Sequence, residues 1–305
     1  MPELPEVEVV RAGLEPALAG ARIDAVTVSD VRALTRHAGD AADFEARASG
    51  RRVEGVVRRG KFLWMPLEPR AGGNATPEGE AIVGHLGMSG QMLLRESGIP
   101  PLRHERVRLD IRHPDHGELA VVFVDQRTFG SLAIDRLHPT PDGAAGGRGS
   151  GMALVPGQVA HIARDPLDPA FDEDGFRYAV RRSRSAIKRV LLDQTVVSGI
   201  GNIYADEALW ASRLHPERLG RDLPSRSLGR LLDEVRAVLH RALAEGGTSF
   251  DAQYVNVNGQ AGYFAHSLNA YGRTGEPCPR CGTPIVRVSF TNRSSHYCPK
   301  CQRRT

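Results

Sequence analysis

The sequence predicts an α+β protein with a β-rich N-terminal region, a helical middle region and a small C-terminal cysteine module. Short alternating apolar runs fill residues 21–131, and residues 185–245 carry apolar side chains at helical spacing. All four cysteines lie between positions 278 and 301. A chain of 305 residues is also long enough for two domains, each with its own core.

The N-terminal region is expected to begin with one helix and to continue as strands. Val7, Val10 and Leu14 share one face of a helix over 5–15, which Pro16 should end or kink. Runs separated by Gly, Pro and charged turns then predict a β-sandwich or barrel. These runs are RIDAVTV, RRVEGVV, KFLWMPL, AIVGHLGM, RVRLDIR and ELAVVFV, and the loop 69–80 among them is expected to be exposed.

A Pro- and Gly-rich stretch over 138–152 is the expected linker after a first domain of residues 1–137. Helices are then expected over 185–193, 202–214 and 227–245, the last one closed by two glycines. We therefore expect a helical domain over 153–270, with a loop-like end from Thr248, and a cysteine module over 271–305.

Two basic segments stand out against a net charge of only +4. Residues 271–305 carry seven Lys or Arg and one Glu, and residues 177–189 carry six cations and no acid. Two such segments favour a polyanionic partner, although a solvated charged face is the alternative for each. No apolar run reaches transmembrane length and no basic-then-apolar leader opens the chain, which favours a cytoplasmic protein without a membrane partner.

The cysteines form two CxxC pairs, CPRC and CPKC, with 16 residues between them. This spacing predicts one structural zinc ion in a four-thiolate shell. Disulfides are disfavoured in a cytoplasmic chain, and a redox CxxC needs only one pair. The predicted ligands are Cys278, Cys281, Cys298 and Cys301.

Two further segments suggest chemistry. Gly199 and Gly201 precede a helix start at Asn202. Backbone amides at such a start favour a phosphate-binding site, although a tight corner between two helices is the alternative. At the N-terminus, removal of Met1 exposes the secondary amine of Pro2, and an α-amino group titrates near neutral pH, so it can act as a nucleophile. The plainer alternative is that the prolines and acids there only start a helix.

Several segments, in this order, resemble the formamidopyrimidine-DNA glycosylases, the bacterial 8-oxoguanine DNA glycosylases. They are MPELPEVE, RRGKFLW, HLGMSG, QTVVSGIGNIYADEALW, GGTSF, GYF, YGRTGEPCPRCGTPI and SSHYCPKC. The resemblance implies an N-terminal β-sandwich with an N-terminal helix, a helical domain with a helix–two-turn–helix motif, and a β-hairpin zinc finger. It also implies base excision repair of duplex DNA that carries oxidised purines or abasic sites.

The resemblance assigns roles to individual residues. Pro2 is the expected nucleophile, Glu3 the proton donor and Lys61 the active-site lysine, so that a Schiff base forms and β- and δ-eliminations cut the strand. Glu6 is expected to face the damaged base, and the loop from Thr248 to Tyr263 to close over it. The expected DNA-contacting residues are His85, Met88, Arg127, Phe129, Lys188, Asn202 and Arg293.

Two departures from the family pattern lie beside Arg127, because Thr128 replaces a second Arg and Gln126 a Pro. Two rival interpretations also stay open. Endonuclease VIII shares the expected fold and nucleophile but prefers oxidised pyrimidines, and its N-terminus usually has Gly where Leu4 stands. A non-catalytic zinc-ribbon protein would explain the basic segments but not Pro2, Glu3 or Lys61. The expected location is the bacterial cytoplasm in association with the nucleoid, and a monomer that clasps DNA is the simplest expectation for the oligomeric state.

Overall fold

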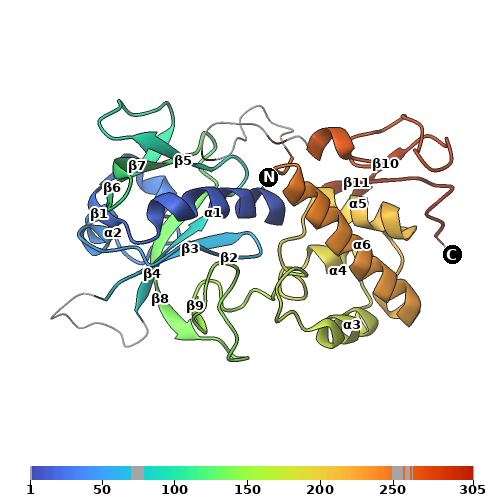
Figure 1. Ribbon diagram of the computed structural model, residues 1–305. Helices are drawn as coiled ribbons and strands as arrows, with labels where there is room; N and C mark the ends of the chain where they lie inside the picture. The colour runs from blue at the N-terminus through green and yellow to red at the C-terminus, as the bar shows by residue number, and fades with distance from the viewer. Residues whose placement is uncertain (1, 70–78, 249–256, 258–261, 263, 305) are drawn as a thin grey trace. The chain divides into compact units, whose positions relative to one another are not determined.

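The computed structural model describes residues 2–69, 79–248, 257, 262 and 264–304 (Figure 1). The chain divides into two compact units, residues 1–161 with 248–262 and residues 162–247 with 263–305. None of the described helices is long and apolar enough to cross a membrane.

The first unit is the predicted β-sandwich, built from two antiparallel sheets that share one core. One sheet has the order β1-β6-β7-β5 and the other the order β2-β3-β4-β8-β9. The core takes Ile23 and Phe123 from the first sheet, Leu63 and Ile134 from the second and Val10 from helix α1. The strands are β1 (Arg22–Val28), β2 (Val57–Arg59), β3 (Phe62–Leu67), β4 (Glu80–His85), β5 (Gln91–Glu96), β6 (Glu105–His113), β7 (Gly117–Val124), β8 (Ser131–Pro139) and β9 (Leu154–Pro156).

Helix α1 (Leu4–Leu18) extends one turn beyond its predicted end. Pro16 lies inside it, and the helix continues because Ala17 and Leu18 are buried in the core. A short helix α2 (Ala41–Ala48) was not predicted, although Asp40 caps it by accepting from the amide of Asp43.

The expected linker over 138–152 folds back onto the sandwich. Strand β8 runs to Pro139 and pairs with β9, so the compact unit reaches residue 161. The glycines there serve close packing, because a Cβ on Gly146 would lie 1.9 Å from the carbonyl oxygen of Leu154, and one on Gly147 would lie 2.3 Å from that of Arg58. Residues 70–78 of the expected exposed loop lie outside the described residues.

The second unit is helical and ends in the cysteine module. Its helices are α3 (Glu173–Arg182), α4 (Ile187–Leu192), α5 (Asn202–Ser212) and α6 (Ser225–Ala244), and its hairpin is β10 (Val286–Phe290) with β11 (Arg293–Tyr297). Helix α3 was not predicted. Helix α6 buries one apolar side, which is formed by Leu228, Leu231, Leu232, Val235, Val238, Leu239 and Ala242.

Candidate active site and metal centre

The start of helix α1 places Pro2 and Glu3 directly before the first helical turn, and both are buried. The Glu3 amide donates to Oε2 of Glu6 at 2.8 Å, which satisfies one of the orphan donors of the helix start. The other oxygen of Glu6 accepts from the amide (2.8 Å) and the hydroxyl (3.0 Å) of Thr248. Glu6 therefore ties the predicted nucleophile segment to the first residue of the expected lesion-capping loop, most of which lies outside the described residues.

The turn that carries Lys61 joins β2 to β3 and is held by buried arginines. Gly60 has φ +56°, a left-handed conformation that favours glycine. Arg58 donates from one terminal nitrogen to the Gly60 carbonyl at 3.2 Å and from Nε to Glu8 at 2.7 Å. Arg59 donates to the carbonyl of Gly146 at 2.8 Å. These bonds hold Lys61, which is half-buried, on a rigid turn.

His85 ends strand β4 and remains neutral near pH 7. Burial, then the nearby charges of Arg36 and Lys61, lower the pKa of His85 from 6.5 to about 4. Its Nδ1 accepts from the Gly87 amide at 3.1 Å, so the neutral ring carries its proton on Nε2. A neutral His85 can therefore still donate one hydrogen bond to a phosphate.

Met88, Arg127 and Phe129 are exposed on two neighbouring loops of the sandwich. The loops meet backbone to backbone, since a Cβ on Gly87 would lie 2.4 Å from the backbone of Phe129 and Gly130. Because Met88 and Phe129 are exposed, neither side chain belongs to the sandwich core.

Asp125 joins these loops and was missed in the sequence. It is fully buried and accepts from the Ser89 hydroxyl (2.6 Å), the Arg127 amide (3.1 Å) and the Gly130 amide (2.8 Å). The available signal was an Asp at the head of the turn DQRTFG, because Asp side chains commonly bond backbone amides two residues on. Asp125 thus fixes the loop that presents Arg127.

The α4–α5 turn is closed by Gln194. Its amide nitrogen donates to the carbonyls of Leu192 (3.0 Å) and Ile200 (2.9 Å), and its oxygen accepts from the Gly199 amide (3.0 Å). Asn202 begins α5, and its buried Oδ1 has no hydrogen-bond partner among the described residues. A helix start of this kind suits an anion.

Lys188, a predicted phosphate contact, is bonded to partners inside the protein in this structure. The side chain is fully buried, and its ammonium forms an ion pair with Asp206 at 2.6 Å. It also donates to the Ser294 carbonyl (2.9 Å) and the Ser295 hydroxyl (3.1 Å) of the hairpin. A charge buried in this way is compensated inside the protein. Arg293, one residue before Ser294, is exposed at the end of the hairpin.

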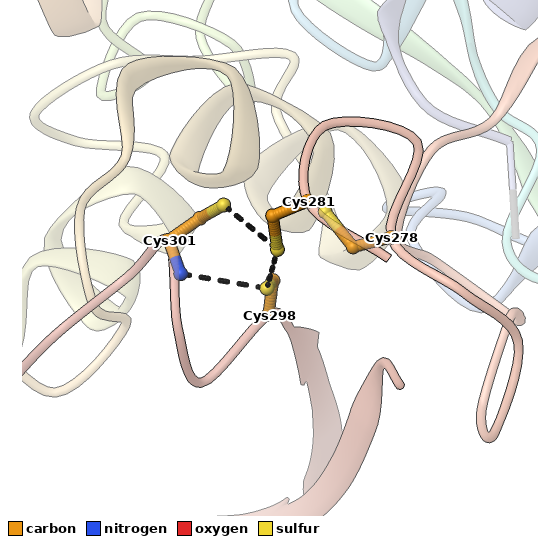
Figure 2. Close-up of side chains that lie close together, drawn as sticks. All are labelled: Cys278, Cys281, Cys298 and Cys301. Atoms are coloured by element: carbon orange, nitrogen blue, oxygen red, sulfur yellow. Dashed lines mark hydrogen bonds between the residues drawn. The ribbon is translucent and has the colours of Figure 1, made fainter. Parts of the chain in front are cut away.

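The four predicted cysteine ligands converge at the base of the hairpin (Figure 2). Their sulfur atoms all lie within 4.8 Å of one another, with 3.5 Å between those of Cys281 and Cys298. Zinc–sulfur bonds of about 2.3 Å in a tetrahedron place sulfurs roughly 3.8 Å apart, so the cluster fits one zinc ion. Hydrogen bonds from Thr283 lower the pKa of Cys281 to about 6, whereas burial raises the pKa of Cys298 to about 12.

Helix α5 supports this cluster from outside. The indole N–H of Trp210 donates to the sulfur of Cys278 at 3.4 Å. The guanidinium of Arg280 lies 4.1 Å from the centre of the Trp210 ring and donates to the Trp210 carbonyl at 3.1 Å. Outer contacts of this kind orient metal ligands, so Trp210 is a functional residue that the sequence analysis did not find.

Family models match most of the chain. Residues 1–132 match the formamidopyrimidine-DNA glycosylase N-terminal domain, residues 162–253 the H2TH domain of formamidopyrimidine-DNA glycosylase, and residues 275–304 the zinc finger found in FPG and IleRS. The match over 1–132 is to a glycosylase domain, which the interpretation as a non-catalytic zinc-ribbon protein does not explain.

Curated relatives and solved structures agree. Formamidopyrimidine-DNA glycosylase from Leifsonia xyli is 60% identical over 305 residues, covering 99% of this chain and all of that protein. The one from Thermobifida fusca is 53% identical and covers 100% and 98%. Lactococcus lactis Fpg bound to abasic-site DNA is 29% identical, covers 99% of both chains and has a TM-score of 0.78. The same protein has been solved with DNA that contains an oxidised pyrimidine, at 28% identity, a TM-score of 0.77 and coverage of 99% and 100%. The chain belongs to the formamidopyrimidine-DNA glycosylase family.

Proposed function

We propose that this glycosylase removes oxidised purines, 8-oxoguanine and formamidopyrimidines, from duplex DNA and then cuts the strand with its own lyase activity. The observation that carries the proposal is the burial of the N-terminal residues Pro2 and Glu3. Pro2 and Glu3 are buried at a capped helix start, in a domain that matches the family's N-terminal model. Removal of Met1 gives Pro2 a free amine, and the enzyme works as a monomer on the DNA of the nucleoid.

Pro2 is the nucleophile. The lone pair of its nitrogen attacks C1′ of the damaged nucleoside, the C1′–N bond breaks, and its electrons leave with the base, which takes up a proton. Glu3 gives a proton to the ring oxygen O4′ as the sugar opens. The Pro2 nitrogen loses its own proton, and an iminium between Pro2 and C1′ results.

Strand cleavage follows from the iminium, because it acidifies the neighbouring C–H bonds. Loss of a proton from C2′ breaks the C3′–O bond, and the second elimination breaks the C5′–O bond. Lys61 holds a phosphate and keeps the amine of Pro2 unprotonated through its own charge. Zinc takes no part in these steps; held by its four cysteines, it maintains the fold of the finger.

The damaged nucleotide must leave the base stack before C1′ can be reached. Met88 and Phe129 are exposed and apolar, so they suit the hole that it leaves, and Arg127 suits the orphaned partner base. His85, Asn202 and Arg293 bind backbone phosphates. Glu6 faces the extruded base, and its side chain is held by its bonds to Thr248.

Borohydride trapping tests this proposal. The Met-processed protein is mixed with an 8-oxoguanine duplex, and the adduct is located by peptide mass analysis. We expect a covalent adduct on Pro2. An N-terminally acetylated protein should give none, whereas Pro5→Ala, which changes the other proline of the same turn, should give the adduct at an unchanged level. The absence of an adduct from intact, processed protein would refute the mechanism.

Oxidised pyrimidines are a second candidate substrate, because the related Lactococcus lactis protein has been solved with such DNA. Single-turnover excision of 8-oxoguanine opposite C should be faster than excision of an oxidised pyrimidine from a matched duplex. The reverse order would favour the endonuclease VIII-like specificity.

A further inference from the structure

Lys188 on helix α4 has three hydrogen-bond acceptors around its ammonium. They are Oδ1 of Asp206 at 2.6 Å, the Ser294 carbonyl at 2.9 Å and the Ser295 hydroxyl at 3.1 Å. An ammonium group has three donors, so these acceptors can take all of its hydrogens. Both Lys188 and Asp206 are shielded from solvent, which makes this a buried ion pair with its remaining hydrogen bonds satisfied.

These acceptors surround the end of the finger hairpin. Ser294 is the residue after Arg293, and Phe290 pairs with Arg293 across the hairpin. The Lys188 ammonium also lies 5.3 Å from the centre of the Phe290 ring. Lys188 therefore contacts both strands next to Arg293.

Asp206 on helix α5 completes the support from the other side. Its Oδ2 accepts from the His296 amide at 2.8 Å, and its Oδ1 accepts from the Ser295 hydroxyl at 3.1 Å. The residues after Arg293 are thus bonded to α4 through Lys188 and to α5 through Asp206. A hairpin held by two helices cannot turn its end freely.

The contacts of residue 188 also explain why it is a lysine and not an arginine. Only three of the 40 basic residues are lysines, Lys61, Lys188 and Lys300, so the composition strongly favours arginine. A guanidinium is planar and longer, and it cannot direct three short bonds from one nitrogen to three acceptors. The buried site needs a compact ammonium.

We propose that Lys188 is a positioning residue that fixes the end of the finger so that Arg293 meets the DNA backbone. The inference rests on the proposed function, in which Arg293 binds a phosphate. It assigns Lys188 an indirect effect on DNA affinity, and it predicts that arginine cannot replace lysine even though the charge is the same.

The test compares Lys188→Arg with Lys300→Arg in the full-length, zinc-loaded protein. Lys300 is an exposed lysine in the same finger, so its variant is the matched control for the same chemical change. Binding to an abasic-site duplex is measured from low to high salt, with zinc content and circular dichroism recorded for each protein. We expect Lys188→Arg to bind about tenfold more weakly and to lose roughly one unit of salt slope, the same loss that we expect of Arg293→Ala. Lys300→Arg should behave as the parent.

The double variant Lys188→Arg with Arg293→Ala should bind no more weakly than Arg293→Ala alone, because the position of an absent side chain has no effect. Additive losses would overturn the proposal. So would a parent-like affinity and slope for Lys188→Arg, which is what a direct phosphate contact by Lys188 predicts.

Two further measurements keep the proposal testable if Lys188→Arg does not fold or if Arg293 does not contact DNA. If Lys188→Arg does not fold, Ser295→Ala removes one acceptor and should show a smaller loss of affinity in the same direction; parent-like binding would overturn the proposal. If Arg293→Ala leaves binding unchanged, the finger contact in the proposed function is wrong. Faster amide hydrogen exchange at residues 294–296 in Lys188→Arg would then still support the structural half of the inference, and unchanged exchange would refute it.

Discussion

Arg58 on β2 and Glu8 on α1 form a buried ion pair, with 2.7 Å between Nε of Arg58 and Oε2 of Glu8. Arg58 is 3% exposed and also donates to the Gly60 carbonyl in the turn that carries Lys61. The helix that begins after Pro2 and the turn that presents Lys61 are therefore joined through one guanidinium.

Replacing Arg58 with Met should lower both stability and the rate of Schiff-base formation. Loss of one partner of a buried ion pair costs about 3 kcal/mol of unfolding free energy, here moderated by Arg11, which contacts Glu8 at 2.9 Å. The Lys61 turn loses its bond at Gly60, so we expect trapping on abasic-site DNA to slow by about tenfold. Urea unfolding and single-turnover trapping measure the two effects.

Arg51→Met is the matched control. Arg51 is 6% exposed, contacts Glu80 at 3.0 Å and donates to the Leu67 carbonyl, so it has the same kind of partners away from the turn of Lys61. The Arg51→Met variant should lose a similar unfolding free energy but form the trapped adduct with DNA at the parental rate. Equal slowing in both variants would show that Arg58 has no specific link to catalysis.

Asp125→Asn should weaken recognition of the base opposite the lesion. In the structure the two carboxylate oxygens of Asp125 accept from the amides of Arg127 and Gly130, one each. Asparagine has an NH₂ group in place of one oxygen, so it can accept from only one of these amides, and the loop of Arg127 loses its fixed shape. We expect excision opposite C to slow by about tenfold and the ratio between C and A as partner base to fall. The exposed Asp24→Asn serves as a control. An unchanged ratio would contradict the role given to this loop.

His85 should make stability fall at acidic pH. Its folded pKa of about 4 lies below the unfolded value of 6.5, so the unfolded state binds more protons between these values. The contribution is complete above pH 6.5 and is lost as pH falls toward 4, by up to about 3 kcal/mol. The difference in unfolding free energy between pH 7 and pH 4 should be smaller in His85→Gln. An equal difference in both proteins would show that His85 is not the titrating group.

Trp210→Phe should lower zinc affinity while preserving the fold of the helical unit. The variant keeps the ring packing but removes the donor to the Cys278 sulfur. Loss of an outer contact typically costs 10- to 100-fold in metal affinity, and we expect the lower end, about tenfold. Competition with a chelating dye gives the affinity, and Trp64→Phe in the sandwich is the control. Chelation of all zinc should abolish DNA binding in both variants.

Local patterns predicted much of this protein. The CxxC spacing depends on ligands a few residues apart, and the four cysteines do converge. The apolar period of α6 and the alternation in β6 depend on neighbours along the chain, and both elements lie where the pattern indicates. The family resemblance supplied the fold class, which the structure and the family matches confirm.

The errors concern contacts between residues distant in sequence. The sequence did not reveal that Lys188 is buried, because its burial depends on Asp206 and on a hairpin about a hundred residues later. The glycines at 146 and 147 suggested a linker, whereas they allow close packing against residues that the linear pattern does not reveal. The position of Asp125 at the head of a turn indicates only its bonds to nearby amides, and the pairing of β5 with β7 brings Ser89 and its loop near it.

The bonds between Glu6 and Thr248 limit where the protein can be divided into separately expressed fragments. Residues 248–262 group with the sandwich, although residues on both sides of them group with the helical unit. The helical unit is therefore interrupted in sequence. A fragment that starts after His161 would include residues 248–262 but not the sandwich with which they group. A fragment that ends at His161 would lack Thr248, so Glu6 would lose the hydrogen bonds that Thr248 donates to it. Separate expression of two halves would thus require a rejoined chain in which a short designed connection replaces residues 248–262.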